Sequence, residues 1–498
     1  MKRTTRVRWL RGLAVLCAAA LLAVAPATAQ AQDEEEGGGS FFEEDDHAAE
    51  EEERGDGSTR VGGEVELELR AYPEWDDADE LADSETEAVP RVRTEFVHEG
   101  RSSEAVAQLE YSSRILEGIG VSGSPADGAS MDVGMLVEEL IDEAYIQLFY
   151  DNLDVEFGYL KTTWGTGDEV HVVDVLNPMD FTDFMNPDYN DRKLAEKMVK
   201  LNIYTGPQGL LELAYVPVLG QDRYATEGRW RPYSFDALEE YLYEIAAVPT
   251  NLFDKEDAKA VLAEITTEAA TAAEPASLSD GQYGLRYSTS VGGVDLGAVY
   301  YFGFIREPAI SVPETDPEDY HVGFDRVNLF GLEFATVLSG FNLRAEAAYK
   351  MTEDFAGDDP EVHNHRIAYM GGFDRDLPVS SINMNIQAQG EYILHSDEVS
   401  DNGPADTDYD PGDDEHYWTN TLVASVEDRY RNDTVIPQVD FVMTAETRDF
   451  LLRPGVEFVL ADDASLNVRG SMFEGDEDTQ FGRFDDNDHL EMSIEYAF

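Results

Sequence analysis

The last ten residues of the chain, HLEMSIEYAF, alternate between apolar and mostly polar side chains. The apolar positions are Leu490, Met492, Ile494, Tyr496 and Phe498, and the positions between them are Glu491, Ser493, Glu495 and Ala497. Successive side chains of a β-strand point to opposite faces, so the segment predicts a strand with one apolar and one polar face. Such a strand fits a soluble sandwich, or a barrel whose apolar face meets lipid.

The same alternation recurs from Val61 to the C-terminus in about eighteen short segments, with sixteen as the alternative count. Clear examples are Val65-Leu67-Leu69, Leu153-Val155-Phe157-Tyr159 and Phe341-Leu343-Ala345-Ala347-Tyr349. Tyr and Phe gather near the segment ends, where the aromatic girdles of a membrane barrel would fall. The pattern predicts an all-β chain of many antiparallel strands.

The connections between these segments alternate in length. Asp151-Asn152 and Gly292-Gly293 leave room only for tight turns, whereas residues 219–280 form a very long connection. A soluble sandwich has no reason to keep its long loops at one end, but outer-membrane barrels have short periplasmic turns and long external loops. We therefore expect residues 61–498 to form a transmembrane antiparallel β-barrel with both ends in the periplasm.

The N-terminal region predicts export. Residues 1–31 combine five basic residues, an apolar run too short to span a bilayer and small residues that suit cleavage, as in a secretory signal peptide. The only cysteine, Cys17, lies there, so the mature chain has no thiol. Residues 32–60 are acidic and glycine-rich, and we expect them to be disordered. The terminal Phe498 resembles the signal read by the barrel assembly machinery, which places the barrel in a bacterial outer membrane.

The charge balance limits the partners. The chain has 104 acidic and 35 basic residues and a formal net charge of -69, which excludes nucleic acid as a partner by repulsion. Asp406, Asp408 and Asp410 suggest a calcium loop, but Pro411 stands where an EF-hand has glycine, so the match fails. We expect no cofactor, although the acidic external loops could bind divalent cations weakly.

The polar positions of the strands assign the inner wall of the barrel. These residues are Glu64, Glu66, Glu68, Glu156, Glu212, Arg286, Arg344, Glu346, Arg453, Arg469, Glu491 and Glu495. Charges of both signs would be costly in a dry core and are expected around water. A barrel of about eighteen strands is also too wide for its own side chains to fill. We therefore expect a channel for passive diffusion of small solutes, cation-preferring because its wall and mouth are acidic.

The long connection around 162–192 is the candidate constriction. Our hypothesis is that it folds into the lumen and brings carboxylates and a histidine opposite basic residues. The acidic and histidine candidates are Asp168, His171, Asp174, Asp180 and Asp183, and the basic candidates are Arg192 and Lys200. The alternative is a loop packed at the barrel mouth for stability, with its carboxylates solvated.

One stretch resembles a known family. Trp164-Gly165, Asn177-Pro178-Met179-Asp180 and Arg192-Lys193, followed by Leu211-Glu212-Leu213 and Pro217, resemble the motif of a family of largely uncharacterised bacterial outer-membrane porin-like barrels. The resemblance covers about sixty residues. It implies a porin-like barrel and brings no substrate.

Other functions remain open at this point. Residues 234–273 predict two helices, which form either a lid over the external mouth or a hairpin that covers its own apolar face; we favour the hairpin. A surface structural or adhesive barrel with a loop-plugged lumen is the main alternative to a channel. An outer-membrane hydrolase would need a base such as His171, near Asp168 and Asp174, but catalysis has little support and we expect no enzyme. The barrels could associate as homotrimers.

Overall fold

The computed structural model describes residues 57–73, 85–112, 140–183, 185, 189–226, 228–248, 253–270, 281–410 and 417–498. The predicted signal peptide and all but the end of the predicted disordered segment lie outside these ranges. The first strand begins at Ser58, three residues before the boundary that the sequence predicted at residue 61.

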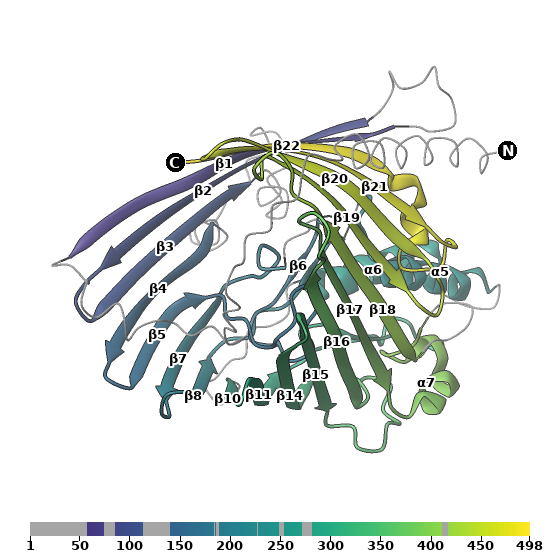
Figure 1. Cartoon of the computed structure of the whole chain (residues 1–498). Helices are drawn as coiled ribbons and strands as arrows, with labels where there is room; N and C mark the ends of the chain where they lie inside the picture. Colours follow the sequence, from purple (N-terminus) through teal and green to yellow (C-terminus); the bar gives the residue numbers. More distant parts are fainter. Residues whose placement is uncertain are drawn as a thin grey trace, which may run out of the picture.

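Eighteen antiparallel strands form one closed barrel (Figure 1). They are β1 (Ser58–Tyr72), β2 (Glu85–Glu99), β3 (Ser103–Ser112), β4 (Ile141–Tyr150), β5 (Leu153–Leu160), β7 (Glu196–Tyr204), β8 (Gly209–Val216), β10 (Gln282–Val291), β11 (Val294–Phe304), β14 (Arg326–Leu338), β15 (Phe341–Met351), β16 (Arg366–Asp376), β17 (Asn383–Ile393), β18 (Trp418–Glu427), β19 (Val435–Thr444), β20 (Phe450–Ala461), β21 (Ala464–Glu474) and β22 (His489–Ala497). Each strand pairs with its neighbour along the sheet, and β1 pairs with both β2 and β22. That last pairing leaves the sheet without an open edge, so the predicted barrel and its strand count are confirmed.

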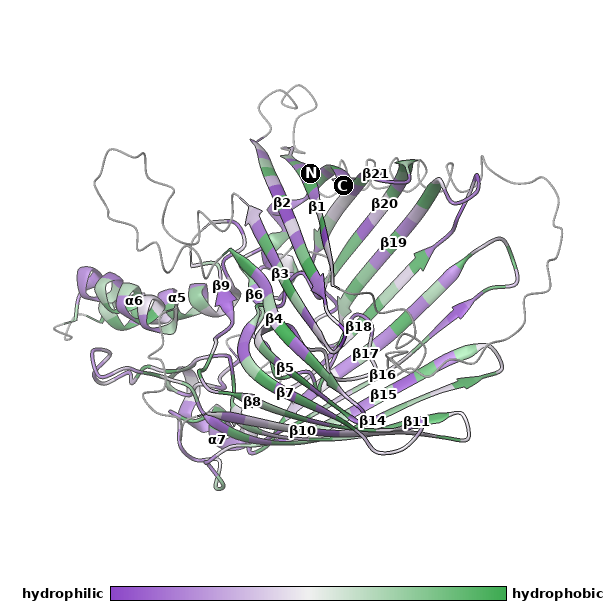
Figure 2. Ribbon diagram, turned by 90° about the vertical axis from the view of Figure 1, so that its left-hand side faces the viewer, coloured by the Kyte–Doolittle hydropathy of each residue, from purple (hydrophilic) through white to green (hydrophobic). Residues whose placement is uncertain are grey.

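The C-terminal alternation closes this seam. Leu67 of β1 is paired with Ile494 of β22, and both side chains are exposed on the outer face. The next residue inward on β1, Glu68, is only 8% exposed. Figure 2 shows the same alternation as hydrophilic and hydrophobic bands along the strands. The outer surface of the barrel is therefore apolar and the charges point inward, as the period of two predicted.

The connections alternate between the two ends of the barrel. Tight turns such as 151–152 and 292–293 lie at one end, and connections such as 161–195 and 217–281 lie at the other. Residues 445–449, between β19 and β20, are the short exception at the long-loop end. The long connections carry β6 (Asp180–Phe181), β9 (Arg223–Tyr224), β12 (Ala309–Ser311), β13 (His321–Gly323), α5 (Tyr233–Ala247), α6 (Lys255–Ala270), α7 (Ser396–Asn402), η3 (Gly403–Ala405) and η4 (Gly482–Asn487).

Helices α5 and α6 form the predicted hairpin, beside the barrel in Figure 1. The Asp254 carboxylate caps α6 by accepting the backbone N–H groups of Glu256 and Asp257 at 2.7 and 3.2 Å. Val261 and Ile265 of the apolar stripe are buried against α5 and the β12–β13 hairpin. The apolar face of the helical hairpin is thus covered partly by its own helices and partly by β12 and β13. Among the described helices, none has the length and apolarity needed to cross a bilayer.

Candidate functional site in the barrel lumen

Between β5 and β7, the described residues 161–183, 185 and 189–195 fold back among the inward-facing side chains; we call them the lumen loop. Its residues contact wall side chains from β1, β8, β15, β17 and β20. Because these strands lie on different sides of the barrel, the loop reaches across the lumen. Two parts of it differ in their contacts: the root, residues 161–178, and the tip, residues 179–192.

Asn177 ties the two ends of the loop together. Its side-chain oxygen accepts the backbone N–H of Thr162 at 2.8 Å. Its amide nitrogen donates to the carbonyl oxygens of Leu160 at 2.7 Å and Leu194 at 2.9 Å. These hydrogen bonds join the end of β5 to the chain that enters β7. The asparagine of the Asn-Pro-Met-Asp motif is therefore a brace at the neck of the loop.

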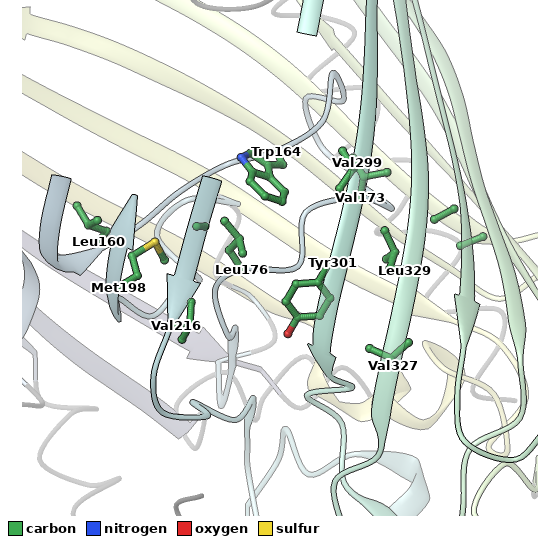
Figure 3. Packing of buried hydrophobic residues seen from close by; sticks show 13 residues of the cluster. Leu160, Trp164, Val173, Leu176, Met198, Val216, Val299, Tyr301, Val327 and Leu329 are labelled. Carbon is green, nitrogen blue, oxygen red and sulfur yellow. The ribbon is translucent and has the colours of Figure 1, made fainter. Parts of the chain in front are cut away.

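The root is held by an apolar core inside the barrel (Figure 3). Trp164 has no exposed surface, and its indole N–H donates to Glu212 Oε1 on β8 at 3.2 Å. Val173 and Leu176 are also fully buried. Gly284 on β10 leaves room for the ring, since a Cβ there would lie 2.5 Å from Trp164. Around the loop lie wall residues of this core: Met198, Ala214, Val216, Val299, Tyr301, Val327, Leu329, Ala348 and Ala368.

Glu346 on β15 anchors the backbone of the root. Its two carboxylate oxygens accept N–H groups from Thr166 at 2.6 Å, Gly167 at 3.0 Å, Val172 at 2.8 Å and Val173 at 3.3 Å. Four donors satisfy a buried carboxylate that would otherwise be costly. The sequence places Glu346 on the wall, but nothing in its neighbourhood indicates this role.

The glycine of the Trp-Gly pair permits this anchor. Gly165 has φ +113°, a conformation that side chains with a Cβ rarely adopt. A Cβ at this position would also lie 2.5 Å from Glu346 Oε1 and 2.9 Å from His171 Nδ1. The motif glycine is thus required by both backbone conformation and space.

Asp174 and Lys193 form a buried ion pair within the loop, with Nζ and Oδ2 2.6 Å apart. The Tyr189 hydroxyl donates to the same carboxylate at 2.9 Å. Burial lowers the pKa of the Lys193 ammonium, and the Asp174 carboxylate opposes that shift. The pair fixes Arg192-Lys193, the basic end of the motif, to the root.

His171 lies next to this pair. Its side chain is 3% exposed, and its ring centroid lies 4.4 Å from that of Tyr189. Burial lowers the pKa of His171, with the nearby carboxylates of Asp174 and Glu346 opposing. His171 Nδ1 is buried without a hydrogen-bond partner, 3.8 Å from Glu346. The ring is therefore neutral at pH 7.

The tip is held by charges. Asp183 forms a bidentate ion pair with Arg70 on β1. Arg70 Nη1 donates to Oδ1 at 2.9 Å, and Nη2 donates to Oδ2 at 3.0 Å. Arg70 is 2% exposed and also contacts Glu68 on its own strand, with Glu491 of β22 3.7 Å away. Arg453 on β20 donates to the backbone oxygen of Met185 at 3.3 Å. The tip thus rests on the seam where β1 meets β22.

A second ionic contact joins the root to the opposite wall. Asp168 forms an ion pair with Arg344 of β15 and accepts a hydrogen bond from Asn385 of β17 at 2.8 Å. Arg344 also lies 2.8 Å from Asp374. The Asp168 side chain is 39% exposed, so this contact is far wetter than the one between Arg70 and Asp183.

Two predicted basic partners lie elsewhere. Lys200 Nζ is 3.3 Å from Glu156, its register partner on the wall. Arg192 belongs to the loop itself, with its guanidinium 5.9 Å from the centre of the Tyr189 ring. Asp180 accepts the backbone N–H of Thr182 at 2.9 Å and thus closes a local turn. Arg70 and Arg344 of the wall instead pair with Asp183 and Asp168 of the loop.

Arg70 was missed by the sequence analysis, although the signal was present. It follows Glu64, Glu66 and Glu68 at the same spacing of two and therefore faces inward.

The remaining wall residues form local ion pairs. Arg286 of β10 bridges Glu212 at 2.7 Å and Glu333 of β14 at 3.0 Å. Arg469 lies 3.9 Å from Glu491, and Arg91 lies 3.3 Å from Glu66. Charges of both signs thus line the wall in alternation.

At the seam near the tight turns, carboxylates are in excess. Glu66 and Glu495 are directly opposed in register, and Glu64 lies one inward position further along β1. Arg91 and Arg93 of β2, the register partners of Glu66 and Glu64, also contact Glu110 and Asp191.

Metal coordination finds no support in the described ranges, where no group of three or more His, Cys, Asp or Glu side chains could hold an ion. Instead, the Asp406 carboxylate accepts the backbone N–H of Asp408 at 2.9 Å, and the Asp408 carboxylate accepts the backbone N–H of Asn364 at 2.6 Å. These carboxylates organise their own loop.

The barrel is closed, its exterior is apolar, its interior is charged, and a long loop folds against its inner wall. This architecture is that of a transmembrane β-barrel. The chain belongs to the family described as "Protein of unknown function (DUF1302)", which matches residues 74–498. The match begins after β1 and takes in the other seventeen strands of the barrel. No curated protein matches the chain.

Solved structures with similar architecture include OccK11 (OpdR) of Pseudomonas aeruginosa, at 8% identity and TM-score 0.43, covering 88% of this chain and 96% of that one. OccAB3 of Acinetobacter baumannii has 9% identity and TM-score 0.44, covering 89% and 99%. OccK9 (OpdG) of P. aeruginosa has 9% identity and TM-score 0.44, covering 89% and 98%. These likenesses are distant.

Proposed function

We propose that this protein is an outer-membrane channel for passive diffusion of small solutes. The observation that carries the proposal is the division between the two faces of the closed sheet. Leu67, Met492 and Ile494 are exposed on the outside, where lipid would cover them. Arg286 and Glu333 are ion-paired on the inside, where water would solvate the charges that remain.

The lumen loop is the constriction in this proposal. It reaches from the Trp164 core on one side to Arg70 on the other, so solutes must pass beside it. Ion pairs on both sides hold its carboxylates in place, which would give the passage a fixed width and charge.

The proposed preference for cations rests on the carboxylates at the seam. Glu64, Glu66 and Glu495 are half-buried on the inner wall near the tight turns. Arg91 and Arg93, the register partners of Glu66 and Glu64, are shared with other carboxylates, and Glu495 is opposed by Glu66. Negative charge therefore remains in excess there. Cations would be concentrated at this end and anions repelled.

One observation favours the second candidate, a surface barrel with a plugged lumen. The Trp164 core fills part of the interior with fully buried side chains, and a buried ion pair fixes the tip. If these contacts close the passage, the barrel would serve contact or adhesion instead.

Planar-bilayer recording of the refolded protein under a KCl gradient decides between the candidates. A channel gives stepwise current with a reversal potential that favours K⁺. Changing Glu64, Glu66 and Glu495 together to Gln should move that potential toward zero. The matched control changes Glu240, Glu244 and Glu256 to Gln, which removes three charges from the exposed faces of α5 and α6. A barrel that inserts without current would overturn the channel and favour the plugged barrel.

The membrane location has its own test. Leu67→Lys places a charge on the outer face in the middle of β1 and should oppose assembly by about 2–4 kcal/mol. Leu338→Lys, at the end of β14 beside a tight turn, makes the same change outside the lipid-facing band. Assembly into lipid vesicles, followed by electrophoretic mobility, should fail only for Leu67→Lys. Equal assembly of both variants would contradict a lipid-facing Leu67.

A further inference from the structure

A polar cavity lies between the lumen loop and the wall formed by β15 to β18. Its volume is about 310 Å³, at the lower end of the range for small-molecule sites. Residues that line it include His171, Lys350, Gln389, Glu391, Thr419 and Thr421. Lys350, Glu391 and Thr419 lie near the strand ends that lead to the long connections. The cavity therefore sits on the long-loop side of the root.

The charged groups around this cavity already have partners. The Glu391 carboxylate forms ion pairs with the Lys350 ammonium at 2.7 Å and the Arg366 guanidinium at 3.1 Å. Arg366 is also paired with Asp408. Asp174, which also lines the cavity, is paired with Lys193. Three carboxylates thus meet three cations, and the neutral His171 adds no charge. A charged solute would have to break one of these pairs to gain one of its own.

The uncharged polar groups have binding capacity left. Within the described part of the chain, the side chains of Gln389, Thr419 and Thr421 make no hydrogen bond to protein. An amide offers two donors and an acceptor, and each hydroxyl can donate and accept. They sit on neighbouring inward positions of β17 and β18, where Gln389 and Thr421 are register partners. Together they present donors and acceptors along one wall of the cavity.

We propose that this cavity is a binding site for a small uncharged polyhydroxylated solute, such as a monosaccharide. Hydroxyl groups both donate and accept, so such a solute matches the free amide and hydroxyls without disturbing the ion pairs. The site lies on the approach to the constriction, where a bound sugar would hinder ions. The inference names a solute class for the proposed channel and rests on that function.

Glucose added to the planar bilayer tests this site. Glucose should reduce the potassium current in a saturable way. Gln389→Leu with Thr421→Val removes two hydrogen-bonding groups at similar volume and should raise the half-blocking concentration about tenfold. The matched control is Asn467→Leu, on an inward position of β21 away from the cavity. Glucose should block this variant at the same half-blocking concentration as the unchanged protein.

The outcomes separate the two proposals. Potassium current without saturable block, or block unchanged in the Gln389 and Thr421 variant, overturns the sugar site and leaves the channel standing. Stronger block by glycine than by glucose would show that the cavity takes zwitterions and would also overturn it. If the inserted barrel carries no current, the channel fails. Calorimetric titration of the detergent-folded protein with glucose, compared between the same variants, then decides the site.

Discussion

The root and the tip of the lumen loop reach the same inner wall by different interactions. At the root, Trp164 and its neighbours pack into an apolar core, and Glu346 satisfies four backbone N–H groups. At the tip, Asp183 relies on the guanidinium of Arg70. Apolar burial is non-directional and stabilises roughly in proportion to the area removed from water, whereas a buried ion pair is costly when either partner is lost. The root is therefore held mainly by buried apolar surface, and the tip mainly by paired charges.

The largest effect is expected from the root. Trp164→Ala removes a fully buried ring and leaves Glu212 without its indole donor. Such truncations cost about 3–5 kcal/mol, enough to release the root from the wall. Single-channel conductance should rise, and protease should cut the loop faster. Trp418→Ala, which removes a 57% exposed ring from β18, is the matched control. An unchanged conductance in a folded Trp164→Ala barrel would mean that the root does not hold the loop.

A smaller effect is expected at the tip. Asp183→Asn keeps the shape but removes the charge that faces Arg70, at a cost of about 1.5–3 kcal/mol for hydrogen bonds to a charged group. The tip should detach intermittently while the root stays in place, so current fluctuations should increase more than the mean current. Asp462→Asn makes the same change in an exposed tight turn. If Asp183→Asn opened the channel as far as Trp164→Ala, the root and tip would not be independent.

The wetter ion pair at the root should matter less. Asp168 is 39% exposed beside Arg344, so solvent screens this contact and Asp168→Asn should cost about 1 kcal/mol or less. Asn at position 168 can still accept from Asn385. A double-mutant cycle with Arg344→Met, read by the rate of loop proteolysis, measures the coupling. A coupling as large as that between Arg70 and Asp183 would mean that solvent exposure does not weaken the Asp168–Arg344 pair.

The smallest effect is a dependence on acid at the root. Burial lowers the pKa of His171 below its usual 6.5, so the unfolded loop binds a proton more readily than the folded one. The stability from neutral His171 is complete above pH 6.5 and is lost as pH falls toward the lowered pKa. The other charged and titratable groups that face the ring are the same in the unchanged protein and in His171→Gln. They are Asp168, Asp174, Glu346, Lys193 and Tyr189. Conductance should rise from pH 7 to pH 5 in the unchanged protein and less in His171→Gln, whose side chain does not titrate. Equal pH profiles would exclude His171 as the source.

The strands and their faces were predictable because their signal is local. Leu67 and Glu68 are adjacent in sequence and must point to opposite sides of the sheet, whatever lies around them. The helical hairpin was predictable for the same reason, since the Asp254 cap and the Val261 stripe lie within a few turns. Helix α7, which has only seven residues, was not predicted. A helix so short carries too little periodicity to be recognised.

The partners in the lumen were only partly predictable. The sequence placed Asp168, Asp183, Arg344 and Glu346 inside the barrel, but it paired the loop with Lys200 and Arg192. Lys200 is taken up by Glu156 on the adjacent strand, a contact fixed by strand register. Arg70 reaches Asp183 across 113 residues, and nothing in either local sequence points to the other.

The sequence by itself determined an alternating strand pattern, the inward position of the charges and the alternation of short and long connections. These follow from the period of two and from turn chemistry, which each segment carries on its own. Only the tertiary structure decided that Asn177 braces the neck of the lumen loop, that Glu346 holds its backbone and that Arg70 receives its tip. Those contacts exist because closure of β1 onto β22 brings distant strands around one interior, where the choice of partner depends on three-dimensional distance.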